Sequence, residues 1–186
     1  MNAVLQQFPE KILVIKLSAL GDFILALGAM EAVRRHHPSS HITLLTTPPF
    51  VDIARQSGYF NDVLIDPRPK FHHLQHWWRM FKIFNGGGFT RVYDLQMKDR
   101  TEFYYHLFLQ KPAWSGIVSV SPLSCSRTDL KKMHAFRRHQ VVLKAAGIEV
   151  KLPDISWFKS DVGFFGLQKP YVLLIPGSAP SRPEKR

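Results

Sequence analysis

The sequence contains a single cysteine, Cys125, so no disulfide can form within the chain. A lone cysteine is typical of a reducing compartment, and we expect a cytoplasmic protein. No apolar run reaches the roughly 18 residues that a membrane-spanning helix requires. The first ten residues have neither the basic start nor the apolar core of a signal peptide. These absences argue against a disulfide-stabilised secreted domain and against a helical membrane protein.

Acidic residues are also scarce. The 186 residues include 14 Asp and Glu against 25 Lys and Arg, which gives a formal net charge of +11. Such an excess predicts an anionic partner: nucleic acid, phospholipid headgroups or a phosphorylated substrate. No helix-turn-helix, RNA-binding strand motif or zinc-finger pattern accompanies the charge, so we expect no nucleic-acid partner. The G-x-G-x-x-G fingerprint after the first strand is missing as well, which argues against an enzyme that uses a dinucleotide.

The pattern that is present alternates short apolar runs with amphipathic segments. We predict strands over 12–17, 41–46, 62–66, 89–95 and 113–118, and helices over 23–37, 50–56, 68–84, 101–110 and 134–146. We expect residues 119–129 to be irregular. This order predicts an α/β fold: a doubly wound, mostly parallel, Rossmann-like sheet with right-handed crossovers.

The first strand leads into a short polar turn, Ser18 to Asp22, before the helix. Ligands of open α/β sheets bind beyond the carboxyl ends of the strands, so Asp22 lies where a ligand is expected. Gly21 can adopt backbone angles closed to other residues and lets a ligand approach closely. The sequence is compatible with two roles for Asp22, which do not exclude each other: it could cap the helix N-terminus, and its carboxylate could face the ligand.

The segment 68–84 mixes Lys and Arg with aromatic residues. Leu74, Trp77, Trp78 and Phe81 recur at helical spacing, which predicts one apolar face. That face either packs on the sheet or lies on a membrane surface, where aromatic and basic residues are both favoured. Histidines 72 and 76 are four residues apart but lack Glu or Cys partners, so we expect no metal site.

A second polar cluster follows the strand that ends near Leu95. Gln96, Arg100 and Thr101 should lie at the same edge of the sheet as Asp22. An arginine there would hold a carboxylate through two parallel hydrogen bonds. The alternative is a helix start with a solvated charge cluster.

Four segments together resemble the family 9 glycosyltransferases, the lipopolysaccharide heptosyltransferases. Residues 12–22 resemble the opening of that family, and residues 93–101 resemble its Asp-Leu-Gln segment, although Met97 stands where the family usually has glycine. The other two segments are the helix from His134 to Gly147 and the tail 171–186. The resemblance implies a GT-B architecture. Residues 1–150 would be its acceptor-binding domain, and residues 151–186 a linker and the first strand of a truncated nucleotide-sugar-binding domain.

The resemblance also implies roles for particular residues. Asp22 corresponds to the proposed catalytic base, and no metal or other cofactor is implied. The implied acceptor-binding residues are Ser18, Gly21, Gln96, Arg100, Thr101, Arg127 and His134, and the implied donor-phosphate-binding residues are Ser178 and Lys185.

The implied reaction transfers a heptose, with inversion, from ADP-heptose or another nucleotide sugar. The acceptor would be an anionic lipid-linked sugar (Kdo-lipid A or a heptosyl acceptor), met at the cytoplasmic face of the bacterial inner membrane. Because the resemblance covers only the first half of the family's architecture, we expect no turnover from these residues alone. A non-catalytic basic domain that binds anionic lipid or sugar is the alternative.

Overall fold

The computed structural model describes residues 10–70, 72–158, 163–166, 170 and 172. In this part of the chain, a five-stranded sheet has the order β3-β2-β1-β4-β5, and every neighbouring pair is parallel. The strands are β1 (Lys11–Ile15), β2 (His41–Thr46), β3 (Asp62–Ile65), β4 (Arg91–Asp94) and β5 (Ala113–Ser115). The predicted α/β class and the parallel, doubly wound sheet are thereby confirmed.

Helices connect the strands. They are α1 (Leu20–Ile24), α2 (Leu27–His36), α3 (Val51–Gln56), α4 (Leu74–Gly86), α5 (Asp99–Leu107), α6 (Arg127–Lys131) and α7 (Ala135–Lys144), with 3-10 turns η1 (Pro48–Phe50) and η2 (Gly163–Phe165). The single helix predicted over 23–37 is wrong, because the helix is interrupted at Leu25 and Ala26 and forms α1 and α2. The irregular segment predicted over 119–129 is also wrong at its end, where α6 begins at Arg127.

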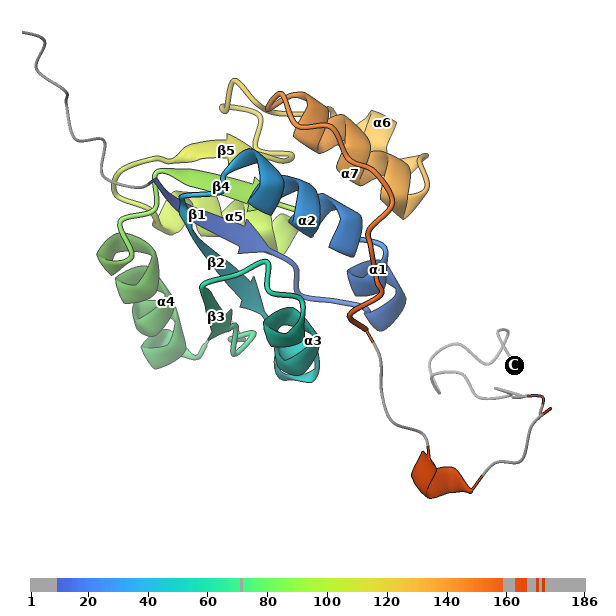
Figure 1. Ribbon diagram of the computed structural model, residues 1–186. Coiled ribbons are helices and arrows are strands. Elements are labelled where there is room, and N and C mark those ends of the chain that lie inside the picture. The colour runs from blue at the N-terminus through green and yellow to red at the C-terminus, as the bar shows by residue number, and fades with distance from the viewer. Residues whose placement is uncertain (1–9, 71, 159–162, 167–169, 171, 173–186) are drawn as a thin grey trace, which may run out of the picture.

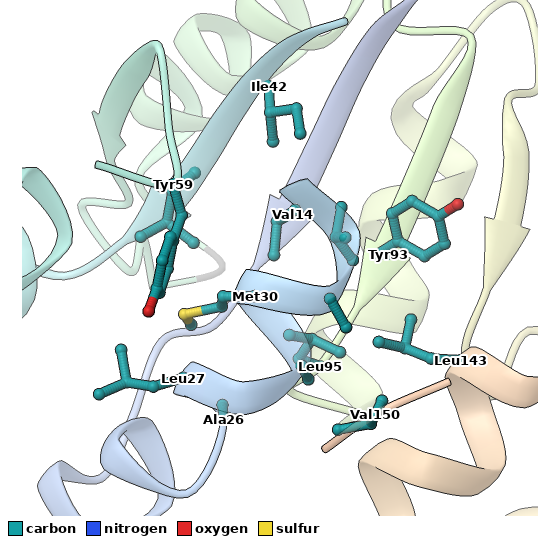
Figure 2. Close-up of a cluster of buried hydrophobic side chains, with 14 of the residues drawn as sticks. Val14, Ala26, Leu27, Met30, Ile42, Tyr59, Tyr93, Leu95, Leu143 and Val150 are labelled. Atoms are coloured by element: carbon teal, nitrogen blue, oxygen red, sulfur yellow. The ribbon is translucent and has the colours of Figure 1, made fainter. Parts of the chain in front are cut away.

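The two faces of β1 enter two separate hydrophobic clusters. Ile12 and Val14 pack with residues of α2, α3 and α7, as Figure 2 shows for the cluster around Val14. Leu13 and Ile15 pack with residues of α4 and α5 on the other face. Alternate side chains of a strand point to opposite faces, so a strand covered on both sides is apolar throughout. Figure 1 shows this layering, with α2 and α7 on one face and α4 on the other.

The interpretation that the face of Leu74, Trp77, Trp78 and Phe81 packs on the sheet is wrong for Leu74 and Trp78. Met80 and Phe84 are buried against the sheet, whereas Leu74 is 76% exposed and Trp78 is 59% exposed. Successive helical residues are separated by about 100°, so Trp78 and Met80 point in nearly opposite directions. The helix therefore has apolar residues on its inner face and on its outer face. None of the described helices is both long enough and apolar enough to cross a bilayer.

The chain after α7 runs along α2 and does not leave the domain at once. Ile148 and Val150 are buried, and the Asp154 amide donates to Glu31 Oε2 at 3.2 Å. Further on, Trp157 Nε1 donates to the Tyr59 hydroxyl at 3.1 Å. Residues 148–157 thus pack against α2 and Tyr59, in the region where the sequence predicts a linker.

Two glycines differ sharply in the space around them. A Cβ atom on Gly28 would lie 2.4 Å from the backbone oxygen of Lys151, because the segment after α7 crosses α2 at this point. Gly21 has open space around it and lies inside α1 with no positive φ. Gly21 therefore does not use the backbone angles that are closed to other residues, although the open space around it leaves room for a ligand.

We expect Gly28→Ala to lower the free energy of unfolding by about 2 kcal/mol, because the added methyl group must displace backbone. Gly21→Ala should leave stability unchanged or raise it by up to about 1 kcal/mol, because alanine favours a helix. Urea unfolding of the two variants and the parent checks this. Equal effects of the two substitutions would contradict the packing of residues 148–157 on α2.

Candidate functional site

The loops after β1 and β4 are held together by one side chain at the carboxyl edge of the sheet. Gln96 Oε1 accepts hydrogen bonds from the amides of Leu17 at 3.0 Å and Ser18 at 3.2 Å. Its Nε2 donates to Ser18 Oγ at 3.4 Å. β1 is the strand at which the direction of winding reverses, with β2 on one side and β4 on the other. Gln96 therefore shapes the switch point, where ligands of open α/β sheets bind.

Asp94, the last residue of β4, organises the loop that carries Gln96. One carboxylate oxygen accepts from the amides of Gln96 at 3.0 Å and Met97 at 2.9 Å, and the other accepts from the Thr101 hydroxyl at 2.7 Å. Asp94 is fully buried. Burial raises the pKa of its carboxyl to about 6, although these hydrogen bonds and the charge of Lys16 act in the opposite direction.

Met97 has a backbone conformation that glycine favours. Its φ is +51°, in the left-handed region, where an L side chain costs about 1–2 kcal/mol. The amide hydrogen bond to Asp94 holds the residue there. The family that the sequence resembles usually has glycine at this position. Methionine therefore replaces glycine at a residue whose backbone conformation is strained for an L side chain.

A buried lysine lies beside this loop. Lys16 directly follows β1, is 4% exposed, and donates from Nζ to the Leu95 carbonyl at 3.2 Å. Burial lowers the pKa of the Lys16 ammonium to about 8, although the nearby carboxylates of Asp22 and Asp94 oppose this effect. The charge of this lysine favours the ionised form of the Asp94 carboxylate.

A small hollow opens above Lys16. Its volume is about 40 Å³, room for roughly one water molecule, so a larger ligand would lie at its mouth. It is lined by Lys16, Asp22, Leu95, Gln96, Met97, Lys98, Ala135, Arg138 and His139.

Helix α7 contributes the last two of these side chains. His139 is buried, and burial lowers its pKa to about 4, with the charge of Lys16 acting in the same direction. The Nε atom of Arg138 is buried and has no hydrogen-bond partner among the described residues.

Asp22 is the exposed carboxylate of the hollow. It is the third residue of α1, whose N-cap is Ala19 and whose start has no side-chain capping bond. The interpretation of Asp22 as the helix cap is therefore wrong. Within the described part of the chain, its carboxylate makes no hydrogen bond and no ion pair within 4 Å. It is accessible to a ligand.

The other residues implied by the resemblance divide into groups. Ser18, Gly21 and Gln96 lie with Asp22, and Thr101 is buried behind them as a partner of Asp94. Arg100 is turned away from the hollow: it donates to the Pro69 carbonyl at 3.3 Å and lies over the Trp77 ring.

Arg127 and His134 are both engaged locally. Arg127 forms ion pairs with Asp99 and Glu102. His134 is the N-cap of α7, with its Nδ1 accepting from the Phe136 amide at 3.4 Å. The implied donor-binding residues, Ser178 and Lys185, lie outside the described residues.

Several side chains at or beside the hollow were missed by the analysis of the sequence. Lys16 and Asp94 could have been found, because each is a charged residue at the end of an otherwise apolar strand. Arg138 and His139 left no such signal, since only tertiary packing brings α7 to this edge. No cluster of three or more His, Cys, Asp or Glu side chains that could hold a metal ion occurs among the described residues.

Arg68 is a further cation near the end of β1. Its guanidinium donates to the Leu17 carbonyl at 2.8 Å, and its amide donates to the buried carboxylate of Asp66 at 2.7 Å. The carboxyl edge thus carries Arg68 beside the β1 loop and Lys98 and Arg138 around the hollow. This distribution of charge suits an anionic ligand.

Comparison with known proteins finds no matching family model and no matching curated protein. Solved structures do match. A family 9 glycosyl transferase from Veillonella parvula DSM 2008 is 23% identical, with a TM-score of 0.59 over 79% of this chain and 43% of that one. The E. coli heptosyltransferase WaaC with ADP-2-deoxy-2-fluoro heptose is 14% identical, with a TM-score of 0.57 over 79% of this chain and 51% of that one.

WaaC with ADP is 16% identical, with a TM-score of 0.52 over 77% of this chain and 48% of that one. The chain thus spans about half the length of the solved structures it matches. At these identities the likeness shows the fold. The resemblance to family 9 glycosyltransferases is confirmed at that level.

The buried ammonium of Lys16 should make stability depend on pH. Its pKa in the folded protein, about 8, is below the 10.5 of an unperturbed lysine. Between these values the unfolded chain binds more protons, so the free energy of unfolding should rise with pH. The full shift corresponds to about 3 kcal/mol.

Urea unfolding between pH 7.5 and 10 should show this rise in the parent and its loss in Lys16→Met. Lys144→Met, which changes an exposed lysine of α7, is the matched control and should keep the rise. A rise that persists in Lys16→Met would show that Lys16 is not the cause.

Proposed function

We propose that this chain is the acceptor-binding part of a glycosyltransferase. Its main support is the accessible carboxylate of Asp22 at the switch point of a fold shared with family 9 glycosyltransferases. The similar E. coli heptosyltransferase is described with ADP and with ADP-2-deoxy-2-fluoro heptose. We therefore favour a nucleotide sugar, ADP-heptose first, as the donor. We favour an anionic lipid-linked sugar of the lipopolysaccharide inner core as the acceptor.

In the proposed reaction, Asp22 is the general base. The acceptor hydroxyl attacks the anomeric carbon of the donor sugar, and the bond from that carbon to the diphosphate breaks on the opposite face, which inverts the configuration. The hydroxyl proton passes to the Asp22 carboxylate as the new bond forms. The exposed carboxylate of Asp22 in the first turn of α1 is accessible to that hydroxyl.

The cations around the hollow suit the charge of the proposed acceptor. Lys98 and Arg138 line the hollow itself. A guanidinium binds a carboxylate or phosphate through paired hydrogen bonds, and the buried Nε of Arg138 has no described protein partner. Arg138 is therefore the residue to which we assign the acidic group of the acceptor, in place of Arg127, which is paired with Asp99 and Glu102.

The donor side of the reaction rests on the resemblance alone. We propose that Ser178 and Lys185 contact the nucleotide-sugar phosphates at the start of a second domain. We propose further that the protein works in the cytoplasm, at the inner membrane. Because the 186 residues span about half the length of the solved structures they match, we expect them to give no transfer of a radiolabelled sugar on their own.

In a protein that also carries a nucleotide-sugar-binding domain, Asp22→Asn should reduce transfer by about 10²–10⁴-fold, the usual contribution of a general base. The dissociation constant for the acceptor should stay within about threefold, because the amide keeps the shape of the side chain. Transfer of radiolabelled heptose to an acidic glycolipid measures the first quantity, and calorimetry measures the second.

Asp52→Asn is the matched control, because Asp52 is an exposed carboxylate in the first turn of α3. It should transfer sugar at the parent rate. Full activity of Asp22→Asn would remove Asp22 from the role of base. Acceptor binding with no transfer by the parent itself would favour a non-catalytic binding domain.

A further inference from the structure

Helix α4 presents an apolar surface to solvent. Leu74, Trp78 and Phe81 fall within about 60° of one another around the helix. Leu74 and Trp78 are exposed and Phe81 is half-buried, whereas Met80 and Phe84 are buried against the sheet. Trp78 and Phe81 stack with ring centroids 5.4 Å apart and an interplanar angle of 10°. A solvated helix of a globular protein normally carries polar residues on this side, so the arrangement marks a surface that another body covers.

The same surface is basic. Lys82 Nζ lies 5.5 Å from the centre of the Trp78 ring, and Arg79 is exposed on the same helix. No Asp or Glu occurs anywhere between Asp66 and Asp94 in the sequence. We refer to Leu74, Trp78, Phe81, Arg79 and Lys82 as the outer face of α4. Its partner must accept apolar side chains and carry negative charge.

The outer face of α4 extends from one edge of the sheet to the other: Leu74 lies toward the edge that carries Asp22, and Lys82 lines a hollow with Lys11 and His41 at the opposite edge. α4 begins after the carboxyl end of β3 and ends before β4, so its first turn lies at the carboxyl edge of the sheet (Figure 1). Trp77 packs edge-on against Phe103 of α5, with ring centroids 5.2 Å apart. Phe103 is itself partly exposed and extends the apolar surface toward the start of α5, the helix that supplies Thr101 to Asp94.

We propose that the outer face of α4 docks on the surface of an anionic phospholipid bilayer. Tryptophan and phenylalanine are favoured at the level of the headgroups, where Lys and Arg gain from the negative potential of anionic lipids. Docking through the first turns of α4 would bring the carboxyl edge of the sheet, and with it the hollow beside Asp22, toward the membrane.

Charge distinguishes a bilayer from a second copy of the chain. Two copies that met through this face would bring Arg79 and Lys82 of each against the same residues of the other, with no carboxylate on α4 to offset them. An anionic bilayer neutralises these charges and also accepts Leu74 and Trp78. The proposal concerns a lipid surface alone, so it stands whether or not the chain takes part in sugar transfer.

Flotation of the 186-residue chain with vesicles tests the docking. The chain should bind vesicles of 70% phosphatidylcholine and 30% phosphatidylglycerol at least tenfold more tightly than vesicles of phosphatidylcholine alone. The binding should weaken in 0.5 M NaCl, because salt screens the attraction. These vesicles contain no glycolipid and no nucleotide sugar. A chain that does not bind them would therefore not contradict the proposed sugar transfer, and a protein that transfers no sugar would not contradict the proposed docking.

Two double variants separate the charged and apolar parts of the outer face. Arg79→Gln with Lys82→Gln should weaken binding to the anionic vesicles more than tenfold. Leu74→Ser with Trp78→Ser should weaken it about tenfold. The matched controls remove the same number of exposed side chains elsewhere: Lys132→Gln with Lys144→Gln for the charges, and Leu109→Ser with Val120→Ser for the apolar residues. Both controls should bind within twofold of the parent.

A second measurement reports insertion directly. Brominated acyl chains quench tryptophans that reach them, and the parent fluorescence should be quenched by brominated anionic vesicles. Trp78→Leu should lose most of that quenching, because Trp78 is exposed on the outer face of α4, whereas Trp114 is fully buried and Trp77 and Trp157 are half-buried. Circular dichroism and thermal melting confirm that each variant is folded.

Three results would overturn the proposal. The first is equal binding to neutral and anionic vesicles, and the second is an equal loss of binding in a control variant. The third is that the chain binds no vesicles and instead forms a dimer without lipid, as measured by analytical ultracentrifugation, and that Leu74→Ser with Trp78→Ser abolishes this dimer.

Discussion

Two buried charges, on Lys16 and Asp94, determine the shape of the carboxyl edge of this sheet. Lys16 directly follows β1, and Asp94 is the last residue of β4. Removing each charge from water costs free energy, and nearby opposite charges and hydrogen bonds reduce that cost. Asp94 recovers part of that cost by binding the amides of its own loop, and this places Gln96 against the loop after β1. The position of Asp22 depends on this arrangement, because α1 begins directly after the loop that Gln96 holds.

The positive charge of the chain is unevenly distributed, and its two concentrations suit different partners. Around the hollow, Lys98 and Arg138 lie beside buried polar groups, which favours a discrete anionic ligand held in one orientation. On the outer face of α4, Arg79 and Lys82 accompany exposed apolar side chains, which favours a broad surface. The first turn of α4, with Leu74, lies toward the same edge of the sheet as the hollow, whereas Lys82 lies toward the opposite edge, in a hollow shared with Lys11 and His41.

Most of the fold could be predicted from local sequence. Apolar runs such as 12–15 are too uniform for a one-sided strand, and their alternation with helical segments allows only a few topologies. Asp22, Ser18 and Gln96 were placed at one edge by the same reasoning, since parallel strands bring their carboxyl ends together. The break between α1 and α2 was not predicted, because the apolar spacing continues across Leu25 and Ala26 and contains no proline.

The sequence by itself determined the parallel sheet, the excess of positive charge and the carboxylate that follows the first strand, because these depend on residue type and order. Only the tertiary structure decided which side of α4 is buried, since its apolar residues occupy both sides and the packing of Met80 and Phe84 selects one. It also decided that Arg127 pairs with Asp99 and that Arg138 and His139 of α7 line the hollow. These side-chain contacts join residues far apart in the sequence, such as Asp99 and Arg127, which are 28 positions apart, and no local pattern encodes them.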